Sequence, residues 1–436
     1  MDQSQFRLLA TRRFLPIFAT QALSAFGDNV LRNAIAILIT YHLAVTLDLN
    51  APLLVTLASA LFIAPFFMFS ALAGQLADKY EKGSMVRVIK LCEIAFTILA
   101  SASLYTDSAT LMLLALFVSG TLAAFFGPIK YGILPQHLQE NELVAGNGMV
   151  ETGTFLAILL GLLFGGLVIT TEYGTEIVSA VLILTAVTSY LIALAIPVAP
   201  PPAPHLEVDH NLWSSTRAIL SHARDNKLVF QSIVCISWFW ALGAVFLAQF
   251  PAFTRLTLAS DETVSNLLIA AFTVGIAIGS LMCNSLLKGA ISARFAPIAG
   301  LGITIFALDL VWASSGLPTV TDTTPLLDLG EFVAQPFHWR ILADLVGMAL
   351  AGGIFVVPLY AIMQNASADA VRSRIVAAAN VMNAIFMTIA TAAAAAMLGL
   401  GVSIHGVFLA FALVNLVFTV SVIAMARRRP PPEMQG

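Results

Sequence analysis

Residues 74–83 read Gly-Gln-Leu-Ala-Asp-Lys-Tyr-Glu-Lys-Gly and lie at the junction of two long apolar stretches, at about 52–77 and 84–105. Each stretch has roughly the 20 apolar residues that an α-helix needs to cross a bilayer. The junction carries four charged residues, Asp78, Lys79, Glu81 and Lys82, which are stable in water rather than in hydrocarbon. This part of the chain therefore predicts two membrane-spanning helices joined by a short loop.

The same pattern continues along the whole chain. Of its 436 residues, 59 % are hydrophobic and only 10 % are charged, which lies outside the range of soluble domains. We therefore expect an all-α membrane protein with twelve membrane-spanning helices. The expected spans lie at about 14–43, 52–77, 84–105, 109–133, 145–170, 176–197, 228–254, 263–286, 294–314, 341–364, 373–397 and 404–426.

The distribution of Lys and Arg predicts the orientation in the membrane. With both termini cytoplasmic, all but three of the 21 Lys and Arg residues lie on the inner side. The exceptions are Arg32, Arg255 and Arg340. A topology shifted by one helix would reverse this bias, so we expect a multi-pass membrane protein with both termini inside.

A proline-rich segment divides the chain into two halves. It reads Pro197-Val-Ala-Pro-Pro-Pro-Ala-Pro204 and is followed by a polar, basic stretch that ends at Lys227. Segments of this composition form extended, semi-rigid spacers. We predict an N-terminal six-helix bundle over 1–197, a cytoplasmic linker over 198–227 and a C-terminal six-helix bundle over 228–436.

The two halves also resemble each other. Pro128 and Pro358 lie in similar apolar contexts 230 residues apart, and Asn147-Gly-Met-Val150 is echoed 233 residues later by Asn380-Val-Met-Asn383. Two matches at nearly the same offset predict two six-helix pseudo-repeats. Such repeats place the substrate site near the membrane midplane, where access alternates between the two sides.

The first predicted helix carries a polar cluster near its centre, with Asp28, Asn29, Arg32 and Asn33 between apolar flanks. An ionisable side chain at this depth costs about 2.5–3.5 kcal/mol on insertion scales. Asp28 and Arg32 are four residues apart, so they share a helix face and can pair. We interpret the cluster as part of a substrate or ion pathway in which Asp28 attracts an ammonium group or binds a coupling proton or sodium ion. The alternative is a structural ion pair that anchors this helix in the bundle.

Further candidates for the pathway lie in both halves. Lys130, near the inner end of the fourth helix, either contacts a phosphate or snorkels to the inner surface. Glu151 is placed to pair with Lys130 and close an inner gate. The remaining pathway candidates are uncharged: Asn147, Trp238, Trp240, Asn380 and Asn383. Because the charges lie in the first half, we expect one polar wall and one apolar wall, which suit an amphiphile.

Residues 74–83 resemble the signature loop of the major facilitator superfamily, Gly-x-Leu-Ala-Asp-basic-x-Gly-basic. The resemblance implies a conformational latch made by Gly74, Asp78, Lys79 and Lys82. The Asp78 carboxylate is expected to cap the next helix and to pair with basic residues. Glu81 stands where the family pattern has its second glycine.

Four blocks resemble, more narrowly, the bacterial lysophospholipid transporter family. They are Ser24-Ala-Phe-Gly-Asp-Asn29, Gly127-Pro-Ile-Lys-Tyr-Gly-Ile-Leu134, Asn147-Gly-Met-Val-Glu-Thr152 and Phe355-Val-Val-Pro-Leu359. Members move lysophospholipids from the outer to the inner leaflet for reacylation, and by this resemblance Asp28 and Lys130 are pathway charges. The family has an arginine in the seventh helix, where this chain has Val245-Phe-Leu247, and Arg32 is placed to substitute for it.

The resemblance implies a multi-pass protein of the bacterial inner membrane. It would be a flippase-like secondary transporter that works by alternating access on lysophospholipid within membrane lipids. We expect a monomer without metal, organic cofactor or nucleic-acid partner, and an acyltransferase/acyl-carrier-protein synthetase as a possible partner in phospholipid remodelling. One alternative is a proton-coupled exporter of drugs or small metabolites with the same fold. A membrane-bound acyltransferase is the other alternative, but none of the seven histidines is followed five positions later by the aspartate that acyl transfer needs.

Overall fold

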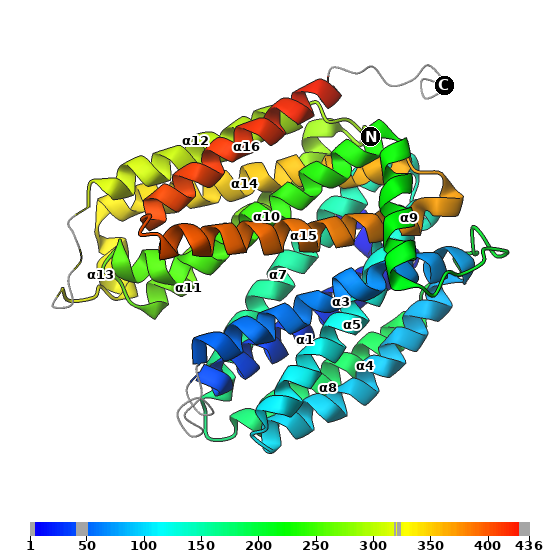
Figure 1. Ribbon diagram of the computed structural model, residues 1–436, viewed down its shortest axis with the longest axis horizontal. Coiled ribbons are helices and arrows are strands. Elements are labelled where there is room, and N and C mark those ends of the chain that lie inside the picture. Colours follow the sequence, from blue (N-terminus) through cyan, green and yellow to red (C-terminus); the bar gives the residue numbers. More distant parts are fainter. Residues whose placement is uncertain (1–4, 41–50, 318–319, 321–323, 427–436) are drawn as a thin grey trace. The chain divides into compact units, whose positions relative to one another are not determined.

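The computed structural model describes residues 5–40, 51–317, 320 and 324–426, and these fold almost entirely into helices (Figure 1). Twelve helices in this part of the chain are long. Their bounds are α1 Leu15–Leu38, α3 Ala51–Lys79, α4 Lys82–Tyr105, α5 Ala109–Gly132, α7 Leu143–Ile169, α8 Gly174–Ala193, α10 Lys227–Leu256, α11 Glu262–Leu287, α12 Ala296–Ser315, α14 Pro336–Asn365, α15 Arg372–Gly399 and α16 Ile404–Ala426. The shorter helices are η1 Gln5–Ala10, α6 Leu134–His137, η3 Glu140–Glu142, α9 Leu212–Asp225, α13 Leu329–Ala334 and η4 Asp369–Val371.

Eleven candidate membrane spans are found among the described residues by length and composition. The remaining long helix is α1, whose central Asp28, Asn29, Arg32 and Asn33 lower its hydropathy. The long helices follow the twelve predicted spans closely, and Pro128 and Pro358 both lie inside helices, α5 and α14.

The chain forms two compact units. The first contains Met1–Asn226 together with Gln364–Ala384, and the second contains Lys227–Met363 together with Ile385–Gly436. The end of α14, η4 and the first half of α15 thus pack with helices from the other end of the sequence. The predicted domain ranges follow covalent order and therefore left this segment in the C-terminal half.

The first unit is built around α1, which packs against α7, α8 and α5. Its apolar face, with Val30, Leu31 and Ile35 fully or almost fully buried, forms the centre of a hydrophobic core. Glycines let α7 approach closely: a Cβ atom at Gly161 would lie 2.6 Å from the carbonyl oxygen of Phe26, and one at Gly165 would lie 2.4 Å from that of Val30. This packing holds the polar cluster of α1 in the interior of the unit.

The predicted linker contains a helix that sequence analysis did not anticipate. Asn211 caps α9 by accepting hydrogen bonds from Trp213 N and Ser214 N, at 3.0 and 3.2 Å. Ser215 of α9 accepts a hydrogen bond from Gln75 Nε2 on α3, at 3.0 Å. The polar part of the linker is therefore docked on the first unit. The apolar face of α9 is short, and the polar residues around it make the segment look like a polar linker in the sequence.

Aromatic packing dominates the second unit. The rings of Phe246 on α10 and Phe408 on α16 stack with centroids 4.4 Å apart. The helices α11 and α14 come together at Gly279, where a Cβ atom would lie 2.0 Å from the carbonyl oxygen of Leu350. Small and aromatic residues thus make a closely packed, largely apolar interior.

Candidate functional site

The two charged residues of α1, Asp28 and Arg32, each form a hydrogen bond with a third residue and not with each other. Asp28 Oδ1 accepts a hydrogen bond from Ser119 Oγ on α5, at 2.6 Å. Arg32 Nη2 donates to Asn29 Oδ1 at 2.9 Å, and the guanidinium lies 5.3 Å from the ring centre of Phe62. The expected pairing of Asp28 with Arg32 is therefore not present in the described structure. The reason is local: Asn29 offers an acceptor one residue nearer, and Ser119 offers Asp28 a donor from another helix.

The two asparagines of the cluster are tied to backbone carbonyls. Asn29 Nδ2 donates to Ala25 O at 2.7 Å within α1. Asn33 Nδ2 donates to Leu162 O on α7 at 2.6 Å, beside the glycine contact between the two helices. Asn29 thereby presents its oxygen to Arg32, and Asn33 anchors α1 to α7.

A second charged pair, which sequence analysis missed, lies on α4. Lys90 is completely buried, and its Nζ donates to Glu93 Oε1 and to Ser24 Oγ of α1, both at 2.5 Å. The ammonium also lies 3.9 Å from the ring centre of Phe126. Sequence patterning placed Lys90 on the cytoplasmic side. It lies within the predicted span 84–105, however, where the free-energy cost of burying a charge in the bilayer applies as it does to Asp28.

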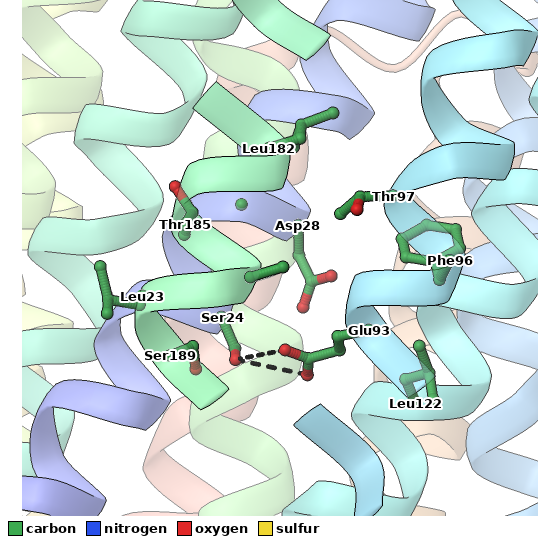
Figure 2. A pocket seen from close by; sticks show the side chains of 12 residues that line it. Leu23, Ser24, Asp28, Glu93, Phe96, Thr97, Leu122, Leu182, Thr185 and Ser189 are labelled. Atoms are coloured by element: carbon green, nitrogen blue, oxygen red, sulfur yellow. Dashed lines mark hydrogen bonds between the residues drawn. The ribbon is translucent and has the colours of Figure 1, made fainter. Parts of the chain in front are cut away.

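These residues surround a small cavity of about 30 Å³ within the first unit, lined by α1, α4, α5 and α8. Figure 2 shows the carboxyl groups of Asp28 and Glu93 turned into the same space, with Ser24 hydrogen-bonded to Glu93. The polar lining is completed by hydroxyl groups, including that of Thr97, and the rest of the wall is apolar. The cavity can hold a small polar or cationic group next to an apolar one.

Lys130 and Glu151 are both in the first unit but form no ion pair with each other in the described structure. Glu151 is fully buried on α7, and one of its carboxyl oxygens accepts a hydrogen bond from the hydroxyl of Tyr131. The Lys130 ammonium lies 4.8 Å from the ring centre of Tyr131. Tyr131 is therefore the partner of Glu151 that the sequence predicted Lys130 to be. It lies one position after Lys130 on α5, and from there its phenol reaches the Glu151 carboxyl group.

Asn147 forms a reciprocal amide pair with Gln364. Asn147 Nδ2 donates to Gln364 Oε1 at 2.7 Å, and Gln364 Nε2 donates back to Asn147 Oδ1 at 3.0 Å. Gln364 Nε2 also donates to Tyr131 O at 3.2 Å. Both amides are fully buried. The pair joins α7 to the end of α14, so Asn147 is a packing contact of the first unit as well as a pathway candidate.

The pathway candidates on α15 also pack inside the first unit. Asn380 Nδ2 is buried, has no hydrogen-bond partner among the described residues, and would lie 2.4 Å from a Cβ atom at Gly127. Asn383 is buried on the same helix. Glycine at position 127 therefore lets α5 come close to the Asn380 amide.

The two tryptophans of α10 have different environments in the second unit. Trp238 is buried, stacks on Phe418 at 4.4 Å and donates to Asn415 Oδ1 at 2.8 Å. Trp240 is half-buried and donates to the hydroxyl of Tyr360 at 2.9 Å. Trp238 thus anchors α10 to α16, which leaves Trp240 as the better placed of the two for a pathway.

The loop after α3 was expected to cap the next helix through Asp78, and this prediction was wrong. Asp78 is fully buried and instead caps α15, where it accepts hydrogen bonds from Ser373 N at 3.0 Å and Arg374 N at 3.3 Å. It also pairs with Arg374 Nε at 3.1 Å. Gly74 permits this approach, because a Cβ atom there would lie 2.9 Å from Ser373 O.

Glu81 caps α4 in place of Asp78. Its carboxylate accepts hydrogen bonds from Gly83 N at 2.7 Å, from Ser84 N at 2.6 Å and from Ala199 N of the linker at 2.9 Å. Burial alone would raise the pKa of Glu81, but the hydrogen bonds from Ser84, Ala199 and Gly83 outweigh it and hold the pKa below its ordinary value of 4.5. The residue that departs from the signature pattern therefore has a specific role as helix cap and linker anchor.

The basic residues of this loop have no ion pair with Asp78 in the described structure. Lys82 is almost completely buried beside Gly132. Lys79 is half-buried, with its ammonium 5.9 Å from the ring centre of Tyr80. Arg374, which lies far away in the sequence, supplies the cation that was expected from Lys79 or Lys82.

Residues 17–337 match the family described as the Major Facilitator Superfamily. The chain belongs to the Major Facilitator Superfamily. The predicted fold class, a helical membrane protein of this superfamily, is thereby confirmed, and the chain is a multi-pass protein of the bacterial inner membrane.

Curated relatives within the superfamily carry the name "Lysophospholipid transporter LplT". That of Serratia proteamaculans (strain 568) is 26 % identical over 371 residues, which cover 83 % of this chain and 82 % of the relative. That of Enterobacter sp. (strain 638) is 27 % identical over 365 residues, which cover 82 % and 81 %. This bears out the predicted resemblance to an LplT-like branch of the superfamily.

Solved superfamily structures show the same fold at low sequence identity. The fucose:proton symporter FucP of E. coli superposes with a TM-score of 0.67 at 12 % identity, covering 96 % of this chain and 100 % of FucP. The human organic anion transporter MFSD10 (TETRAN) superposes with a TM-score of 0.69 at 13 % identity, covering 94 % and 99 %. These likenesses concern the fold alone.

Proposed function

We propose that this chain is a flippase-like secondary transporter that moves lysophospholipids from the outer to the inner leaflet of the bacterial inner membrane. The observation that carries the proposal is the similarity to LplT relatives over more than four fifths of the chain. The proposal includes alternating access, cytoplasmic termini and reacylation of the product by a separate acyltransferase. In this account the chain transports its substrate and does not act on it as an enzyme.

The charge distribution of the first unit supports an amphiphilic substrate. Asp28, Arg32, Lys90, Glu93, Lys130 and Glu151 lie on α1, α4, α5 and α7 of this unit. Charges at this depth are costly unless they face a partner or a polar cavity, and they mark transport pathways. The polar headgroup of a lysolipid would interact with these residues, while its single acyl chain would contact apolar surface.

The pathway residues fall into two groups: those placed to contact a headgroup, and those whose side chains hold helices together. The Asp28 carboxylate faces the cavity and receives one hydrogen bond, from Ser119. We infer that Asp28 is the primary headgroup contact and that Arg32, held by Asn29, supports the phosphate. Lys130 is half-buried at the end of α5 and is placed to contact the phosphate during release. Asn33 and Asn147 act mainly by holding helices, because their side chains bond to α7 and to Gln364.

The test is uptake by purified protein in proteoliposomes. Labelled lysophosphatidylethanolamine and a polar control solute are added outside, and protein-free vesicles give the background. We expect lysolipid to enter faster than background and the solute to enter at the background rate. Entry of the solute alone would instead identify an exporter or symporter of hydrophilic compounds with the same fold.

A further inference from the structure

The cavity between α1, α4, α5 and α8 has an unbalanced charge. Asp28 and Glu93 both line it, whereas the nearest cation, Lys90, is completely buried behind Glu93 and does not line the cavity. Arg32 lies one turn beyond Asp28 and is bonded to Asn29. Lys90 compensates Glu93 from behind, so the two carboxylates that line the cavity leave one negative charge without a cation at the cavity wall.

The contacts of Glu93 fix its orientation. Lys90 Nζ donates to its Oε1 at 2.5 Å, and Ser24 Oγ lies 3.4 and 3.3 Å from its two carboxyl oxygens. The side chain of Glu93 keeps 15 % of its surface exposed, toward the cavity shown in Figure 2. Glu93 is therefore a rigidly held acceptor with a free side.

A primary ammonium group matches this surface. It carries one positive charge and three N–H donors, and hydrogen bonds between an ammonium and a carboxylate are among the strongest in proteins. Asp28 on α1 and Glu93 on α4 offer carboxylate oxygens, and Thr97 and Thr185 add hydroxyl oxygens. The cavity is small, and its volume of about 30 Å³ has room for about two water-sized groups. It suits the ammonium end of a headgroup rather than a whole lipid.

The location suits the head of an amphiphile. The helices α4 and α8, which form one side of the cavity, carry exposed apolar residues on their other faces, including Leu91 and Ile98 on α4 and Leu184 and Leu191 on α8. Such faces are expected to contact lipid in a membrane protein. The cavity therefore lies one helix away from the surface that an acyl chain can reach.

We propose that this cavity is the ammonium subsite of the transport pathway, in which Glu93 selects ethanolamine headgroups over uncharged glycerol headgroups. This inference rests on the proposed lysolipid transport and adds a residue that determines headgroup specificity. Asp28 contacts either headgroup, because in the proposed transport it is the primary headgroup contact for every lysolipid. Lys90 is a positioning residue that holds Glu93 in place.

The test compares two lysolipids that differ in the headgroup. Glu93→Gln keeps the shape of the side chain and removes its charge. We expect uptake of lysophosphatidylethanolamine by this variant to fall about tenfold, the loss expected for one charge-assisted hydrogen bond. Uptake of lysophosphatidylglycerol should stay within about twofold of wild type, because that lipid has no ammonium to lose. The matched control is Glu176→Gln, an exposed residue in the first turn of α8, which should leave the ratio unchanged.

Two results would overturn the subsite. Equal loss of both lipids in Glu93→Gln would show a structural role, and no loss of either would show that Glu93 does not contact the headgroup. Because the substitution leaves Lys90 buried without its carboxylate, the double variant Lys90→Met/Glu93→Gln is measured as well. It removes both charges, should fold as wild type does and should show the same loss of headgroup preference.

A binding measurement separates this inference from the proposed function. Ligand-induced thermal stabilisation in detergent reports affinity without transport. We expect lysophosphatidylethanolamine to stabilise wild type more than Glu93→Gln, even if transport fails in vesicles. Soluble phosphoethanolamine, which has the same headgroup chemistry without a chain, should stabilise much less. Equal stabilisation by the soluble compound would contradict a lipid subsite.

Discussion

The buried carboxylate of Asp78 accepts a hydrogen bond from the backbone N–H of Ser373, which lies 295 residues later in the chain. The same carboxylate pairs with Arg374 at 3.1 Å, so the end of α3 is fixed to the start of α15. A carboxylate at a helix N-terminus is favoured by the helix dipole and by the free N–H groups there. This contact explains why the beginning of α15 packs within the first unit.

Replacement of Asp78 by Asn should destabilise the protein by about 3 kcal/mol, because it leaves Arg374 without its counter-charge at a largely buried site. The measurement is the melting temperature in detergent micelles. Asp107→Asn is the control, since Asp107 is an exposed aspartate in the turn that follows α4. Equal melting temperatures for wild type and Asp78→Asn would contradict the role of this ion pair and helix cap.

Substitution of Gly165 by Ala should destabilise the contact between α1 and α7. The added Cβ would lie 2.4 Å from Val30 O, so the helices must separate at a cost of about 1–3 kcal/mol. Gly243→Ala, in the middle of α10, is the control because a Cβ atom there meets nothing within 4 Å. That variant should be neutral or slightly more stable, since alanine favours helix. Melting curves that rank the two variants in the opposite order would contradict the packing described.

The stabilising effect of Glu81 should depend on pH. Its folded-state pKa is below 4.5, so the stabilisation is fully present above that value and is lost as the pH falls through the folded-state pKa. At pH 7, Glu81→Gln should be less stable by about 1 kcal/mol, which is typical of a weakened N-cap. The difference should shrink on acidification and disappear once the pH is below the folded-state pKa of Glu81. A difference that grows on acidification would have the wrong sign for this account.

The amide pair of Asn147 and Gln364 should show strong coupling in a double-mutant cycle. Asn147→Leu or Gln364→Leu alone leaves a buried amide without its partner, at a cost of about 1–3 kcal/mol. The double variant leaves neither of these two amides, so its loss should be clearly smaller than the sum of the single losses. Additive losses in thermal or chemical unfolding would indicate that the two amides do not depend on each other.

Much of the fold could be predicted from the sequence because membrane helices are set by hydropathy over about 20 residues. The sequence also singles out the polar cluster of α1 and the signature loop as places where charged residues interrupt or join apolar stretches. The partners of Asp28 and Asp78 were not predicted, because each comes from another helix, Ser119 and Arg374 respectively. Local spacing favoured Arg32 and Lys82 instead. The partner of Glu151 was assigned to the correct helix, α5, but it is Tyr131 and not the neighbouring Lys130.

The cavity residues Lys90 and Glu93 were missed for a different reason. Lys90 and Glu93 lie three residues apart in an apolar segment, a pattern that is visible in the sequence. Lys90 was assigned to the cytoplasmic side because it is near the inner end of its helix, and its burial against Phe126 could only come from tertiary packing. The helix in the linker was missed for a similar reason, since its partner Gln75 lies on α3.

Transfer of lysolipid from the outer to the inner leaflet, measured with and without the Asp28 charge, tests the proposed transport most directly. Fluorescent lysophosphatidylethanolamine is added to the outer leaflet of proteoliposomes, and albumin added at later times extracts only the lipid that remains in that leaflet. We expect the albumin-protected fraction to rise rapidly with wild type and at least tenfold more slowly with Asp28→Asn, which keeps the side-chain shape but removes the charge. Wild-type protection no faster than that in protein-free vesicles, or an Asp28→Asn rate equal to wild type, would contradict this transport.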